Sequence, residues 1–226
     1  MVTPFMGYEW DFAAVFRHRE LLLEGAKGTF RLAGMAMVIA IPLGLFVALL
    51  RLSRLPVISW IAVVYTDMFR TSPSIVLIYW FFFAFPLLVG VDFDTFTAVS
   101  LTLGLQTGAY MAEVFRGGIQ SIRPGQWQAA KALGMGLGTT LRYIILPQAI
   151  RRMIPVFFTR LTELFKATSL AAVVSYPEIV QMASRVSSDT FRPIETYTVV
   201  ALFFFTVIFC VSRLVRYAER RFAVPE

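Results

Sequence analysis

The sequence predicts an all-α integral membrane protein with five transmembrane helices and a short cytoplasmic helix between the third and the fourth. Of its 226 residues, 58% are hydrophobic and 15% are charged, whereas a soluble domain carries roughly a quarter charged residues. Apolar runs of about 20 residues, the length that spans a bilayer, recur along the chain. Basic residues flank these runs, as expected for signals that orient membrane helices.

Four uncharged runs are each long enough to cross a membrane. They lie between residues 31 and 51, 70 and 92, 94 and 113, and 195 and 213. A further span, fourth in order, is expected over residues 141–177, although charged residues interrupt it. Just before the second span, residues 55–69 are expected to form an amphipathic helix at or entering the cytoplasmic face.

The basic residues predict the topology, because short loops rich in Lys and Arg stay in the cytoplasm. Such residues gather between the third and fourth spans and after the fifth. This places the N-terminus outside and the C-terminus in the cytoplasm, with residues 178–193 as an outside loop despite Arg185 and Arg192. The net charge of +7 therefore reflects orientation and not binding of nucleic acid.

The chain is expected to be a single transmembrane domain. Residues 1–27 are an N-terminal segment whose four acidic residues do not fit a cleaved signal peptide. Residues 28–217 are the five-helix core, and residues 218–226 are a cytoplasmic tail.

Residues 121–147 predict a short helix, a glycine turn and a second short helix. Pro124 suits the first turn of a helix, where its missing N–H is not needed. Gly134 can take the left-handed conformation that ends a helix. Thr139 or Thr140 could cap the second helix. A compact, ordered projection of this kind suits docking to another protein.

This loop resembles the conserved cytoplasmic loop of bacterial ABC importer permeases. That pattern is Glu-Ala-Ala, three residues, Gly, nine residues, then Ile-x-Leu-Pro, and it is matched here by Gln128, Ala129, Ala130, Gly134, Ile144, Leu146 and Pro147. The departure is Gln128 in place of Glu, which keeps the hydrogen-bonding capacity and loses the charge. One docking contact is therefore expected to be weaker.

Residues 108–122, 69–73 and 168–170 resemble the polar amino acid branch of that family, which includes histidine, glutamine, glutamate and arginine permeases. The resemblance implies an ABC importer permease fold and a multi-pass protein of the bacterial inner membrane. It also implies that Gln128, Ala129, Ala130 and Gly134 dock to the ATPase.

The partners implied by the resemblance are two ABC ATPase subunits, a second permease that is identical or related, an extracytoplasmic solute-binding protein, an amino acid substrate and membrane lipid. ATP and Mg would be bound by the ATPase subunits, with no cofactor in this chain. In agreement, the sequence has no Gly-x-x-x-x-Gly-Lys-Ser/Thr phosphate loop.

Polar residues within the spans are candidates for a substrate path. Gln106, Tyr110 and Glu113 fall at spacings of four and three, so they share one helix face. Glu113 either meets substrate or bridges helices, for instance by pairing with Arg116. Thr168 and Ser169 either offer hydroxyls to a substrate or cap and bend the end of the fourth span.

Arg160, Glu163 and Lys166 recur every three residues and so lie along one helix face. With Arg116 they form a possible internal ion network, and direct contact with substrate is the alternative. No catalytic set and no metal site is expected, since His18 is the one histidine and lies in a charged segment. Cys210 is expected to be a packing or lipid-facing residue.

A non-transporting membrane scaffold, a membrane-embedded enzyme and a passive channel are the competing interpretations. An enzyme would need a catalytic set, and neither a scaffold nor a channel would need the docking loop. The loop therefore favours the importer subunit.

Overall fold

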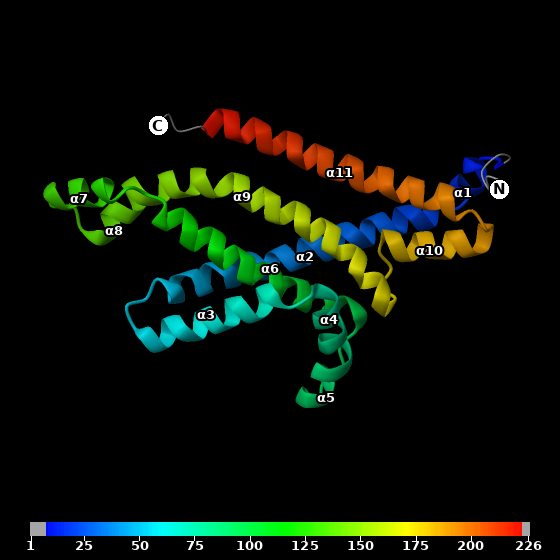
Figure 1. Ribbon diagram of the computed structural model, residues 1–226, viewed down its shortest axis with the longest axis horizontal. Helices are drawn as coiled ribbons and strands as arrows, with labels where there is room; N and C mark the ends of the chain where they lie inside the picture. The colour runs from blue at the N-terminus through cyan, green and yellow to red at the C-terminus, as the bar shows by residue number, and fades with distance from the viewer. Residues whose placement is uncertain (1–7, 223–226) are drawn as a thin grey trace, which may run out of the picture.

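The computed structural model describes residues 8–222, and every element in that range is helical. Two π-helical turns, Trp80–Ala84 and Leu141–Ile145, and a 3-10 helix, Thr168–Val174, join α-helices. The α-helices, shown in Figure 1, are α1 (Phe12–Phe16), α2 (Arg19–Arg51), α3 (Pro56–Thr71), α4 (Ser74–Tyr79), α5 (Phe85–Val89), α6 (Thr95–Gln120), α7 (Pro124–Ala132), α8 (Leu137–Thr140), α9 (Leu146–Ala167), α10 (Ile179–Thr190) and α11 (Pro193–Phe222).

The centre of the fold is the close packing of α2 against α6. Ala36, Ala40, Gly44 and Ala48 form a buried stripe of small residues at four-residue spacing along α2. A Cβ atom added at Gly44 would lie 2.5 Å from the Cβ of Met111 on α6. Small residues let two membrane helices approach until their backbones nearly touch, which maximises van der Waals contact. This helix pair is therefore the frame on which the other helices pack.

Several described helices have the length and composition of membrane spans. Arg19–Arg51 and Pro193–Arg213 are each long and apolar enough alone, and Pro56–Thr71 with Ser74–Val89 qualify together as a bent pair. At about 1.5 Å per residue, the 26 residues of α6 and the 22 of α9 extend about 39 Å and about 33 Å. The count of five spans stays a prediction.

The uncharged run between residues 70 and 92, predicted as the second span, is not one continuous helix. A long helix, α3, occupies residues 56–71 instead, and the chain then turns by 105° into α4 and α5, which project from the bundle (Figure 1). The cause is Pro73, which disfavours the helical conformation in the residue before it. Ser72 accordingly adopts an extended backbone at ψ 135°. The helix expected at the cytoplasmic face, α3, packs in the bundle against α2 and α6.

The segment over residues 178–193, expected as a loop, contains the amphipathic helix α10. The side chain of Glu178 caps it by accepting hydrogen bonds from the backbone N–H groups of Val180 and Gln181. The buried face of α10 packs on α2 and α11. Helix α2 begins at Arg19, within the predicted N-terminal segment, and α11 continues to Phe222, within the predicted tail.

Candidate functional site

Helices α7 and α8 form a projection at one end of the molecule, beyond the ends of α6 and α9 (Figure 1). Pro124 occupies the first turn of α7, as expected. Gly134 follows α7 with φ at 70°, and its N–H donates to the carbonyl of Lys131 at 3.0 Å. The N–H of Met135 donates to the carbonyl of Ala130 at 3.0 Å. This pair of bonds is the Schellman motif, so the projection has a fixed shape.

The second short helix begins differently from expectation. Gly136, and not Thr139 or Thr140, is the residue that precedes α8, and it makes no side-chain cap. The hydroxyl of Thr140 donates to the carbonyl of Gly136 at 3.0 Å from the last turn of α8. Because a Ser or Thr hydroxyl can reach the carbonyl four residues back, this side chain closes the turn internally.

The surface of this projection carries three of the four predicted docking residues. Gln128, Ala129 and Gly134 are exposed, whereas Ala130 is buried at 1% exposure and packs inward. Leu133 and Leu137, which the sequence reasoning missed, are 78% and 70% exposed. The signal that could have found them is the presence of apolar side chains in a segment expected to project into the cytoplasm.

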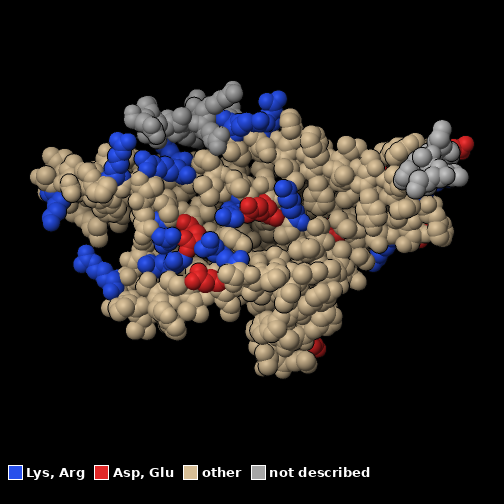
Figure 2. Space-filling view, in the orientation of Figure 1, with Lys and Arg blue, Asp and Glu red and all other residues tan. Residues whose placement is uncertain are grey.

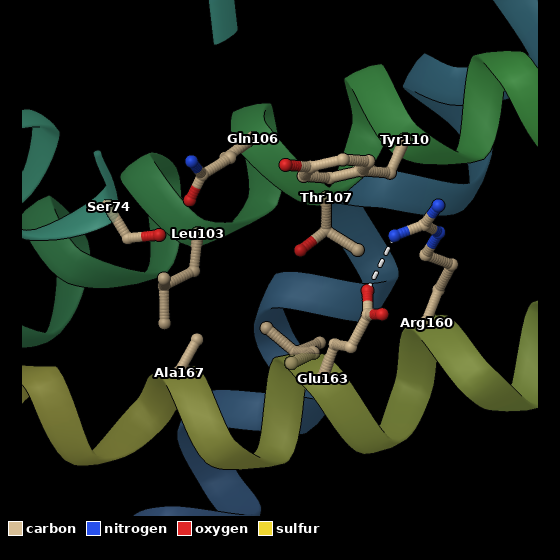
Figure 3. Close-up of a pocket in the computed structure, with 9 residues that line it drawn as sticks. Ser74, Leu103, Gln106, Thr107, Tyr110, Arg160, Glu163 and Ala167 are labelled. Carbon is tan, nitrogen blue, oxygen red and sulfur yellow. Dashed lines mark hydrogen bonds and ion pairs between the residues drawn. The ribbon is translucent and has the colours of Figure 1, made fainter. Parts of the chain in front are cut away.

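A cavity of about 150 Å³ lies between α6 and α9, and two of the five predicted substrate-path residues, Gln106 and Tyr110, line it (Figure 3). Residues of α6 form one wall and residues of α9 the other, with the start of α4 at one end. Its polar lining consists of Ser74, Gln106, Thr107, Tyr110, Arg160 and Glu163, and its apolar lining of Leu103, Leu164 and Ala167.

Gln106 and Tyr110 hold the bend between α3 and α4 against α6. The Gln106 amide donates to the carbonyls of Phe69 at 3.2 Å and Ser72 at 3.0 Å. The Tyr110 hydroxyl donates to the carbonyl of Arg70 at 3.1 Å. These bonds satisfy carbonyls that the helix break leaves without helical partners. Both side chains therefore line the cavity and also fix its end wall.

Arg160 and Glu163 place both signs of charge in the cavity. They form an ion pair at 2.6 Å, and the Arg160 guanidinium lies 4.6 Å from the centre of the Tyr110 ring (Figure 3). The Nε of Arg160 is buried and makes no hydrogen bond in the described structure. Lys166 is exposed, and no ion pair joins it to this set among the described residues.

Glu113 lies outside this cavity, at the centre of a separate ion cluster. It pairs with Arg51 of α2, with Arg116 at 2.5 Å and with Arg70 at 3.6 Å. Figure 2 shows acidic and basic side chains gathered near the middle of the face of the molecule that is turned toward the viewer. These contacts fit the interpretation in which Glu113 bridges helices. Arg116 belongs to the ion cluster around Glu113 and not to the predicted network with Arg160.

Thr168 and Ser169 stand where α9 becomes a 3-10 helix. Their hydroxyls donate to the carbonyls of Phe165 and Lys166, each at 2.7 Å. Thr168 is fully buried. These contacts fit the interpretation in which the two residues cap and bend the end of the helix.

His18 and Cys210 lie away from both the projection and the cavity. His18 precedes α2, and its ring Nδ1 lies 3.1 Å from the carbonyl of Ala14. Cys210 is exposed on the apolar length of α11. Among the residues that the structure describes, no group of three His, Cys, Asp or Glu side chains could hold a metal ion.

Residues 40–224 match the family described as binding-protein-dependent transport system inner membrane component. The probable amino-acid ABC transporter permease protein YckA of Bacillus subtilis (strain 168) is 33% identical over 202 residues, covering 89% of each chain. The glutamine transport system permease protein GlnP of Escherichia coli (strain K12) is 31% identical over 217 residues, covering 96% of this chain and 99% of that one.

A solved structure is similar over nearly the whole chain. The crystal structure of an amino acid ABC transporter with histidines superposes with a TM-score of 0.89 at 30% identity. The match covers 95% of this chain and 100% of that one.

Proposed function

The chain belongs to the family of binding-protein-dependent transport system inner membrane components, and on this premise we propose that it is the permease subunit of an ATP-driven amino acid importer. It would form the translocation pathway as a dimer with an identical or related permease. Two separate ATPase subunits would bind ATP and Mg, and an extracytoplasmic solute-binding protein would deliver the amino acid.

The observation that carries this proposal is the rigid projection formed by α7 and α8. Its exposed face combines Gln128, Ala129 and Gly134 with the apolar side chains of Leu133 and Leu137. Two largely exposed leucines on a capped turn are typical of the apolar centre of a protein interface. We assign this surface to the ATPase, which implies that Ala130 supports the surface from below.

The projection is mechanically joined to the cavity. Helix α8, the π-helical turn Leu141–Ile145 and α9 form one continuous helical segment that ends at Ala167. A guanidinium N–H of Arg152 on α9 donates to the carbonyl of Ser121 at the end of α6. A displacement imposed on the projection would thus be carried along α9 to Arg160 and Glu163 in the cavity wall.

The chemistry of the cavity suits an amino acid. Arg160 can meet a carboxylate and Glu163 an ammonium group, while Ser74, Thr107 and the oxygen of Gln106 offer further polar contacts. Because these two charges pair with each other at 2.6 Å, an arriving zwitterion would exchange one ion pair for two. We propose that this exchange marks a substrate position on the pathway.

The proposed orientation places the projection and the C-terminus in the cytoplasm and the N-terminus outside. The Schellman-capped projection then faces the compartment where ATP is available. The short helices α1 and α10 lie together at the opposite end of the molecule (Figure 1), where a solute-binding protein would dock.

The experiment is affinity purification of the tagged chain from gently solubilised membranes of its native host. We expect a stoichiometric phosphate-loop ATPase in the wild-type preparation and its loss from the Leu133→Asp variant. The matched control is Leu55→Asp, since Leu55 is 58% exposed and, in the proposed topology, on the same side but away from the projection. Retention of the ATPase by the Leu133 variant, or its absence from the wild type, would overturn the proposal.

A further inference from the structure

A second cavity lies between α9 and α11, the antiparallel helices in the upper part of Figure 1. It has a volume of about 250 Å³ and is wide open to the surface. The lining residues are Phe158, Thr159 and Thr162 from α9, with Ser212, Val215 and Arg216 from α11. The cavity between α6 and α9 is lined by other residues of α9, among them Arg160 and Glu163, which lie on a different side of that helix. The two cavities are therefore separate.

The lining joins hydrogen-bonding groups, one positive charge and apolar surface. Arg216 supplies a guanidinium group and Ser212 a hydroxyl. The hydroxyls of Thr159 and Thr162 already donate to the carbonyls of Pro155 at 3.1 Å and Thr159 at 2.7 Å. Among the described residues that line the cavity, none is acidic. A guanidinium group with a hydroxyl beside it is a donor set suited to phosphate oxygens. Phe158 and Val215 add apolar surface next to this set.

The cavity also lies at a defined depth along α11. The uncharged run of that helix ends at Arg213, and the cavity includes residues on both sides of this point, Ser212 and Arg216. The Arg213 guanidinium lies 5.3 Å from the centre of the Phe209 ring. Basic and aromatic side chains at the end of an apolar helix mark the boundary between acyl chains and headgroups. The polar and the apolar parts of the lining thus meet at the depth where a phospholipid changes from its polar headgroup to its acyl chains.

We propose that this cavity binds the phosphate headgroup of an anionic phospholipid. The Arg216 guanidinium and the Ser212 hydroxyl contact the phosphate oxygens, and Phe158 and Val215 contact the first part of an acyl chain. Basic pockets between transmembrane helices on the cytoplasmic side are a known way of holding such headgroups. The inner leaflet is assigned from the proposed orientation, whereas binding itself depends only on the cavity.

The test is lipid binding to the purified full-length chain in a mild detergent, followed by native mass spectrometry during titration with phosphatidylglycerol or phosphatidylcholine. We expect the wild type to retain phosphatidylglycerol selectively. Arg216→Gln should weaken that binding about fivefold, which is the effect of one basic residue near an anionic surface. Ser212→Ala removes one hydroxyl donor and should weaken binding roughly threefold.

The matched control is Arg54→Gln, which removes an exposed arginine between α2 and α3 and should leave phosphatidylglycerol binding unchanged. The unfolding temperature of each variant without added lipid shows whether the fold is intact. Equal losses in the Arg54 and Arg216 variants, or equal retention of the two lipids, would overturn the proposal. Displacement of the lipid by millimolar inorganic phosphate would also overturn it, because the site would then take free phosphate.

Discussion

Glu178 gives a prediction whose size follows from the structure. Its side chain is fully buried between the 3-10 helix and α10, outside the spanning helices. It accepts N–H bonds from Val180 at 2.9 Å and Gln181 at 2.7 Å. Burial disfavours the charged carboxylate and raises the pKa of Glu178 from 4.5 to about 7, with the two backbone hydrogen bonds opposing that shift.

The sign of the pH dependence follows from this raised pKa. The folded chain holds the proton more tightly than the unfolded chain, so the stabilisation is fully present below pH 4.5 and is lost as pH rises through about 7. At roughly 1.4 kcal/mol per pKa unit, the difference corresponds to about 3 kcal/mol.

The perturbation is Glu178→Gln, which keeps an oxygen to accept backbone N–H groups and cannot ionise. At pH 5 the wild type keeps most of the stabilisation from the raised pKa and at pH 8 it has lost nearly all of it. If the two proteins are equally stable at pH 5, the variant should therefore be about 2 kcal/mol more stable than wild type at pH 8. For a chain of this length that is about 4–8 °C in Tm. At pH 5 the two proteins should unfold within a few degrees of each other.

The assay is thermal unfolding of the purified chain in detergent between pH 5 and pH 8. The control is Glu20→Gln, because Glu20 is an exposed glutamate in the first turn of α2, and this variant should keep the wild-type dependence on pH. The reasoning is refuted if the difference in Tm between wild type and Glu178→Gln is the same at pH 5 and pH 8.

Three further substitutions test the packing and the ion cluster by thermal unfolding. Gly44→Val places side-chain atoms where α6 leaves no space and should cost at least about 3 kcal/mol, whereas Gly34→Val, at a position with nothing within 4 Å, should cost less than about 1 kcal/mol; equal losses would contradict the packing argument. Glu113→Gln leaves three guanidinium groups without their shared carboxylate and should lower the free energy of unfolding by about 2 kcal/mol. A loss of stability no larger than that of Glu20→Gln would show that the ion cluster contributes little. Gln106→Leu removes two hydrogen bonds to the α3–α4 bend and should cost about 1–2 kcal/mol, so an unchanged Tm would speak against its anchoring role.

The sequence predicted those elements that depend on residues close together in the chain. The apolar run of α11 follows from hydropathy alone, and the turn after α7 follows from one glycine. The bend at Pro73 was missed because a hydropathy window averages over an uncharged proline and gives no weight to its effect on the preceding residue. Helix α10 was missed because its polar and apolar residues average to a loop-like composition, although Glu178 before it is a capping signal.

The candidate site was predicted where residues share one helix. The spacing of Arg160 and Glu163 predicted their ion pair, and the spacing of Gln106 and Tyr110 predicted a shared face. The cluster at Glu113 joins Arg51 and Arg70 from two other helices, a pairing that depends on tertiary packing. The burial of Ala130 likewise depends on which face of α7 turns toward the bundle.

A transport assay measures directly whether the chain is the permease subunit of an ATP-driven amino acid importer. The complex that co-purifies with the chain is reconstituted in proteoliposomes with its solute-binding protein, and uptake of a mixture of labelled amino acids is measured. We expect uptake that requires ATP, that persists in Leu55→Asp and that is abolished in Leu133→Asp. Uptake that proceeds equally without ATP, or that is unaffected by Leu133→Asp, would contradict it.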